Sequence, residues 1–97
     1  MMREWPFAEP PDEAVVTVKS IFSEGKPILY VYHEEDDFGW QFLDGGRVRN
    51  EDAVLVTLRF LLTRDPSLAE LADLPPGGQA RRASVDAPWF RKVPTSK

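Results

Sequence analysis

The order of apolar and polar positions divides the chain into short strands and short helices. In the first part, residues 14–16 suit a short strand rich in β-branched side chains. Apolar residues then recur three and four positions apart, which predicts a helix over 18–24 with Thr17 as its N-terminal cap. Gly25 suits the left-handed position after a helix, and Pro27 prevents the helix from continuing.

The strongest strand signal is ILYVY at 28–32, which is dense in β-branched and aromatic residues. A second strand, WQFL at 40–43, places Trp40 and Phe42 on one face. Residues 33–39 lie between these runs, so we expect them to form the loop of a β-hairpin.

The pattern of the first strand and helix recurs forty residues later. Residues 55–62 align with residues 15–22, and each segment reads as an apolar strand, a threonine that caps the next helix (Thr17 and Thr57), and the helix itself. We interpret the similarity as shared strand-to-helix turn chemistry rather than as a duplication. Asp65 is predicted to cap a further short helix that has Pro66 at its first position. Residues 79–85 suit a final strand, and the segment DAPWFRKV turns and continues it.

These elements predict one small domain with an irregular lead. Three prolines make residues 1–12 extended, with Trp5 and Phe7 expected to pin this lead to the body, 13–93. Residues 94–97 form a frayed tail. We predict an α+β fold, with a small, mainly antiparallel sheet of three to five strands and two or three short helices packed on one face.

Composition narrows the class of protein. The chain has no cysteine, which excludes disulfides, thiol catalysis and cysteine-based zinc or iron–sulfur sites. A secreted domain of this size usually needs such crosslinks, so we expect a cytoplasmic location. We see no signal peptide and no apolar run near the ~20 residues that a membrane span requires, so no membrane partner is predicted.

Charge is spread unevenly along the chain. Residues 1–78 carry 7 basic and 15 acidic side chains, a net charge of −8, whereas residues 79–97 carry a net charge of +4. An acidic body repels nucleic acid at long range, which makes a nucleic-acid partner improbable. We expect the basic segment to fold back on the body.

The stretch HEEDDFGWQF places four carboxylates next to each other. A calcium loop would need alternating carboxylates around a central glycine, and four contiguous acids in an extended backbone point to opposite sides instead. The sequence leaves open a solvated hairpin tip, a surface that meets a partner, or a metal shared by a pair of these acids. The candidate partner-binding residues are Glu34, Glu35, Asp36, Asp37 and Trp40.

No catalytic arrangement is evident. His33 is the only histidine, and no serine stands in a nucleophile motif, so we predict no catalytic residue and expect His33 at an exposed strand end. Neither a cofactor nor a metal is predicted, since PPGGQARR lacks the lysine of a phosphate loop. APWFRK could stack single-stranded nucleic acid, but we favour Trp89 closing the core while Arg91 and Lys92 face the acidic body.

Three segments carry a resemblance to a known family. AVVTVKSIFSEGKPILYVYHEEDDFGWQFLDG, EDAVLVTLRFLLTRDPSLAELADLPPGGQARR and APWFRK together span residues 14–92. They resemble small bacterial proteins of unknown function related to the immunity-protein-like domain family (domain of unknown function 2185). The resemblance implies a protein that binds and blocks a cognate toxin, and it supplies no catalytic residue.

From residues and resemblance together we predict a non-enzymatic, cytoplasmic protein-binding module. Its acidic hairpin, 33–39, would engage a basic protein such as a toxin effector. The alternatives are a small metal-dependent or accessory enzyme, and a self-associating structural domain. Whether the chain is a monomer or a homodimer stays open.

Overall fold

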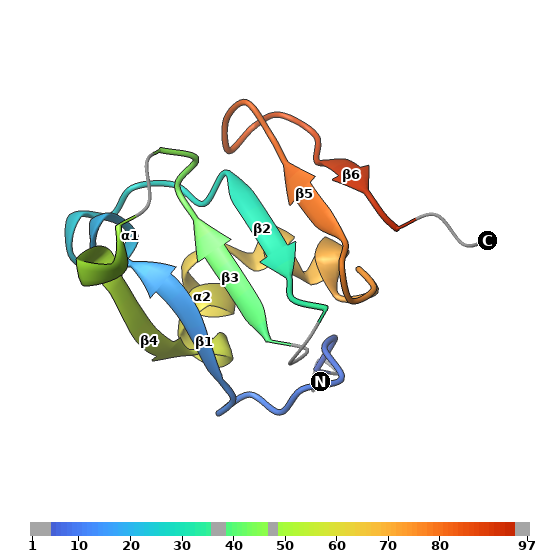
Figure 1. Cartoon of the computed structure of the whole chain (residues 1–97), viewed down its shortest axis with the longest axis horizontal. Coiled ribbons are helices and arrows are strands. Elements are labelled where there is room, and N and C mark those ends of the chain that lie inside the picture. The colour runs from blue at the N-terminus through green and yellow to red at the C-terminus, as the bar shows by residue number, and fades with distance from the viewer. Residues whose placement is uncertain (1–4, 36–38, 47–48, 95–97) are drawn as a thin grey trace.

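The computed structural model describes residues 5–35, 39–46 and 49–94, and within them six strands form one sheet (Figure 1). The strands are β1 (Ala14–Val18), β2 (Tyr30–His33), β3 (Trp40–Leu43), β4 (Ala53–Thr57), β5 (Gln79–Arg81) and β6 (Phe90–Lys92). The helices are α1 (Lys19–Glu24), α2 (Leu58–Arg64) and the 3-10 helices η1 (Asn50–Asp52) and η2 (Pro66–Leu71).

The sheet order is β4-β1-β3-β2-β5-β6, and every neighbouring pair is antiparallel except β1 with β3. The predicted α+β class and the predominantly antiparallel sheet are confirmed. The sheet has one strand more than the upper limit of the prediction. The segment predicted as one strand over 79–85 ends at Arg81, because the chain turns at Ser84, whose carbonyl accepts from the Ala87 N–H at 3.1 Å, and returns as β6.

The helices gather on one face of the sheet, as predicted. Figure 1 shows α2 and η2 behind the strands. Their fully buried side chains pack on the sheet residues Val31, Phe42 and Ala80, which lie next to one another in register. The C-terminal end of α1 joins the same layer, because Arg64 of α2 donates a 2.5 Å hydrogen bond to the carbonyl of Ile21.

The two similar strand–helix segments lie side by side. β1 and β4 pair antiparallel, with Val15 opposite Val56, and each strand leads directly into a helix. The predicted cap on α2 is confirmed, since the Thr57 hydroxyl accepts from the Phe60 N–H at 3.1 Å.

The matching prediction for Thr17 is wrong. Helix α1 begins one residue later, after Val18, and has no side-chain cap. β1 is an internal strand whose pairing with β4 continues through Val18, so Thr17 stays within the strand. Its fully buried hydroxyl donates to the Phe42 carbonyl of β3 at 2.7 Å.

The proline-rich lead is anchored as expected. Phe7 is buried and packs edge-on against Trp40, with ring centroids 5.2 Å apart. Trp5 is half-buried, and its indole N–H donates to the Glu9 carbonyl at 2.6 Å. In the part of the chain that the structure describes, no helix has the length and apolar character needed to cross a membrane.

The basic C-terminal segment folds back on the acidic body through two ion pairs. Arg82 contacts Asp65 at 2.5 Å, and Arg91 contacts Asp73 at 2.8 Å. The Arg91 guanidinium also lowers the pKa of the Asp73 carboxyl, by hydrogen bonding and by its charge. Lys92 departs from the prediction, since it forms no ion pair with any described residue.

Candidate functional site

The acidic hairpin connects two adjacent antiparallel strands of the sheet. β2 and β3 pair from Tyr30–Leu43 to His33–Trp40, and the Glu34 N–H donates to the Gly39 carbonyl at 2.7 Å. This confirms the predicted hairpin. The described ends of the loop, Glu34 and Gly39, therefore lie at one end of the sheet.

The candidate carboxylates differ in their surroundings. Glu34 is half-buried, and it accepts a hydrogen bond from the side-chain amide of Gln41 on β3. Glu35 is exposed. Asp36 and Asp37 lie outside the described residues. Glu35 is thus the one described acid of the hairpin whose side chain is largely accessible to a partner.

Trp40 does not lie on the surface. Its side chain is 2% exposed and is covered by Phe7 from the lead and by the ring of His33. The expectation that Trp40 contacts a partner directly is therefore wrong. The β2–β3 pairing turns this end of β3 so that Trp40 faces the helical layer together with Phe42, and the tryptophan supports the hairpin from beneath.

His33 is also buried, which contradicts its predicted exposure. Its ring stacks on Trp40 with centroids 3.9 Å apart, and its Nδ1–H donates to the Leu74 carbonyl at 2.7 Å. Nε2 lies 3.9 Å from a carboxylate oxygen of Glu9. The physical reason is strand alternation, because His33 is two residues beyond the buried Val31 and shares its face. These contacts give His33 a role in packing.

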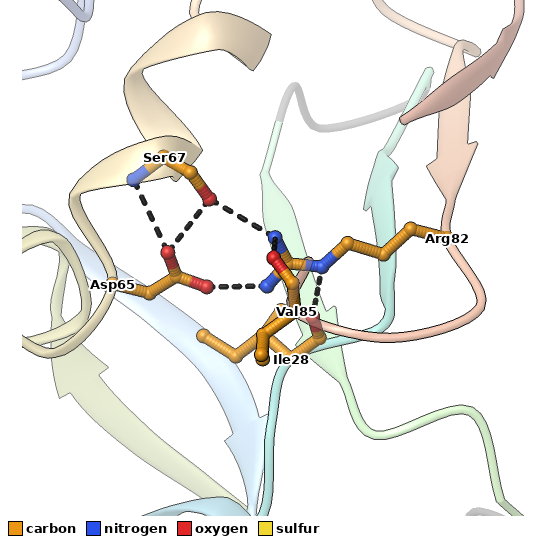
Figure 2. A network of polar contacts seen from close by, with 5 residues as sticks. All are labelled: Ile28, Asp65, Ser67, Arg82 and Val85. Atoms are coloured by element: carbon orange, nitrogen blue, oxygen red, sulfur yellow. Dashed lines mark hydrogen bonds and ion pairs between the residues drawn. The ribbon is translucent and has the colours of Figure 1, made fainter. Parts of the chain in front are cut away.

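A buried polar network surrounds Arg82, just after β5 (Figure 2). The guanidinium Nε donates to the Ile28 carbonyl at 3.0 Å, and one terminal nitrogen contacts Asp65 at 2.5 Å. The other terminal nitrogen donates to the Ser67 hydroxyl at 3.0 Å and reaches the Val85 carbonyl at 3.4 Å.

The guanidinium at the centre of this network is shielded from solvent. The Arg82 side chain is 1% exposed, and its guanidinium lies over the Trp89 ring, 4.2 Å from the centroid. Asp65 accepts from the Ser67 N–H with its other oxygen, as the predicted helix cap. Because the protein itself satisfies these groups, the network is structural, and it ties η2 to the loops before β2 and after β5.

No described cluster has the geometry of a metal centre. Within residues 5–35, 39–46 and 49–94, no three histidine, aspartate or glutamate side chains are placed to hold a metal ion. Two serines contact carboxylates. Ser67 belongs to the Arg82 network, and Ser20 donates to Asp44 at 2.5 Å.

The Ser20–Asp44 hydrogen bond should affect the pKa of the Asp44 carboxyl, which can be measured by titration. Hydrogen bonds from the Ser20 hydroxyl and the Gly46 N–H lower the pKa of Asp44 below its ordinary value. A lowered folded-state pKa adds stability above the unfolded pKa of about 4, and this stability is lost as the pH falls through the folded value. We expect Ser20→Ala to raise the pKa of Asp44 in a carboxyl NMR titration. Ser23→Ala, at an exposed serine, is the control, and an unchanged Asp44 pKa in Ser20→Ala would contradict the assignment.

The more extensive surface is the face of the sheet opposite the helices. Figure 1 is viewed onto this face, and no helix lies in front of the strands. We call it the open face. Strand register places two rows of side chains on this face. The first row crosses all six strands and consists of Leu55, Val16, Gln41, Tyr32, Gln79 and Lys92. The second row crosses four strands and consists of Leu43, Tyr30, Arg81 and Phe90.

The open face has a large exposed apolar side chain on each of its two edge strands. Leu55, on the edge strand β4, is 70% exposed, and Phe90, on the opposite edge strand β6, is 66% exposed. Half-buried Tyr30 and Tyr32 lie between them. Glu34 reaches this face through its bond to Gln41, so the acidic hairpin lies at one end of the same surface.

Comparisons with known proteins were made at three levels. No protein-family model, no curated protein and no solved structure matches the chain.

Proposed function

We propose that this protein is a non-catalytic protein-binding module whose contact surface is the open face together with the acidic hairpin. The observation that carries the proposal is that one side of the sheet has no helical layer, with large apolar side chains exposed at both of its edges. Protein interfaces combine apolar, aromatic and polar side chains, as this face does. The resemblance to the immunity-protein-like domain family supports the same class of function.

The proposed partner is a basic cytoplasmic protein, such as a toxin effector. The hairpin carries four carboxylates in sequence, Glu34 to Asp37, and residues 1–78 have a net charge of −8. Such a surface attracts a basic partner over several ångströms before contact, which raises the association rate. The apolar open face would then supply the short-range contacts that hold the complex together.

The experiment begins with affinity capture of the partner from the native cell lysate. Its association rate is then measured by surface plasmon resonance at 50 and 300 mM NaCl. We expect Glu34→Lys with Glu35→Lys to slow association roughly tenfold at low salt, since long-range attraction changes to repulsion.

The matched control reverses two exposed acids elsewhere. Glu24→Lys with Glu70→Lys changes the net charge equally, on the helices rather than the hairpin. We expect this control to slow association less than threefold. If both double variants slow association equally, the hairpin has no special part in steering and that part of the proposal fails. A Leu55→Ser variant that dissociates at the wild-type rate would count against the open face.

A further inference from the structure

A shallow groove crosses the open face between β2, β5 and β6. Tyr30, Gln79, Arg81, Phe90 and Lys92 lie along it. Tyr30 and Phe90 lie on either side of Arg81 in one row, and Lys92 lies opposite Gln79 in the next. The tyrosine hydroxyl is held by Gln79 at 2.8 Å, so one wall of the groove is fixed in place.

The charge of this groove is opposite to that of the body. Its charged lining residues are Arg81, Arg91 and Lys92, with no carboxylate among them. Arg91 is engaged by Asp73 and by the Glu70 carbonyl. Arg81 and Lys92 form no side-chain hydrogen bond or ion pair with the residues that the structure describes. The side chains of Arg81 and Lys92 are therefore two positive charges in a groove whose lining contains no carboxylate to neutralise them.

The backbone of the edge strand β6, beside the groove, can also pair with another chain. Within the described part of the chain, β6 pairs with β5 alone, and all three of its residues are exposed. The outer edge of such a strand has N–H and C=O groups that can pair with a further extended chain. This feature favours a polypeptide over nucleic acid, which has no equivalent backbone groups for strand pairing.

We infer that the outer edge of β6 takes an extended acidic segment of a partner protein as an additional strand, and that the side chains which this segment presents on the open face reach the groove residues. Alternate side chains of an extended peptide are about 6.8 Å apart, the same spacing as Phe90 and Lys92. An apolar side chain would pack on Phe90, and a carboxylate would meet Lys92. Arg81, diagonal to Lys92 across β5 and β6, would meet a second carboxylate.

This inference goes beyond the proposed function and does not depend on the hairpin. The hairpin would attract a basic surface by its carboxylates, whereas the groove would take an acidic segment by its cations. The proposed roles of the hairpin and of the groove can fail separately, because reversing the charges of Glu34 and Glu35 leaves the groove residues unchanged. A partner with both a basic surface and an acidic extended segment would use both.

The test uses a fluorescein-labelled nonapeptide, Thr-Glu-Thr-Val-Thr-Glu-Thr-Val-Thr, with fluorescence anisotropy as the readout. We expect saturable binding to the full chain that weakens as NaCl rises from 50 to 300 mM. Arg81→Gln with Lys92→Gln should weaken binding about tenfold, since exposed ion pairs each change affinity a few-fold. Lys19→Gln with Lys26→Gln, two exposed lysines outside the groove, removes the same charge and should bind the peptide as the wild type does.

Several results would overturn the inference. The first is that the wild-type chain shows no saturable binding of the acidic nonapeptide. The second is that a peptide with glutamine in place of both glutamates binds as tightly as the acidic one. Equal weakening in the two double variants would mean that only net charge matters. Tighter binding of a nine-nucleotide deoxythymidine strand, lost in Arg81→Gln with Lys92→Gln, would assign the groove to nucleic acid. A wild-type dimer in sedimentation that this variant abolishes would assign it to a second copy of the chain.

Discussion

Replacing Arg82 with methionine should lower the free energy of unfolding by about 3–5 kcal/mol. Methionine matches the aliphatic part of the arginine side chain but has none of the guanidinium donors. The carbonyl of Ile28 and the carboxylate of Asp65 then lose their partner in a site where the arginine is 1% exposed. Urea denaturation followed by tryptophan fluorescence measures the change.

An exposed arginine provides the matched control. Arg59 pairs with Asp12 at 2.9 Å, and both side chains are more than half exposed. Arg59→Met should therefore cost less than about 1 kcal/mol, because water screens a surface ion pair and competes for its donors. If Arg82→Met and Arg59→Met differ by less than about 1 kcal/mol, the network in Figure 2 does not contribute to stability as we describe.

Trp40→Ala is expected to reduce the free energy of unfolding by about 3–5 kcal/mol, as for other large aromatic side chains removed from a core. The indole fills the space between Phe7, His33 and Phe42, and its removal leaves a cavity beneath the hairpin. Thermal and urea denaturation report the loss. Phe90→Ala, at an aromatic residue that is 66% exposed, should change stability by only about 0.5 kcal/mol.

The variant Trp40→Phe distinguishes a role of Trp40 in core packing from a role in contacting the partner. It retains an aromatic ring against His33, so we expect a smaller loss of stability than for alanine and wild-type affinity for a captured partner. A variant that keeps wild-type stability but loses affinity would show that Trp40 does contact the partner. In that case our assignment of this residue to the core would be wrong.

Local signals in the sequence were enough for most elements. The strand at 40–43 and the caps at Thr57 and Asp65 are as predicted, because each depends on residues within a few positions of one another. Thr17 has the same local context as Thr57 and a different role. Its strand lies between two others, and that position is decided by pairing with residues far along the chain.

The candidate site was less predictable. Alternation placed Trp40 and Phe42 on one face, but a strand taken alone does not show which of its faces is covered by helices. His33 could have been recognised as buried, because it shares a strand face with Val31 in an apolar run. The burial of Arg82 had no comparable signal in the sequence. Arginine is seldom buried unless paired, and its partner Asp65 already had a complete local explanation as a helix cap.

The open face could not be predicted from local pattern. Its longest row joins residues that are dispersed from Val16 to Lys92, and only the strand order brings them together. Each of its members looks ordinary in its own segment. The groove at β6 has the same origin, since Tyr30 and Phe90 belong to strands that are separated in the sheet by β5.

The internal position of β1 has a consequence for synthesis on the ribosome. Among the described strands β1 is translated first, yet its two neighbours are β3 and β4, so both of its edges cannot be paired until Thr57 has been added. At roughly 5–20 residues per second, a valine-rich segment keeps at least one unpaired edge for several seconds. Arg82, which fixes η2, is added later still. During translation this nascent chain should therefore be a substrate for chaperones that hold exposed apolar strands.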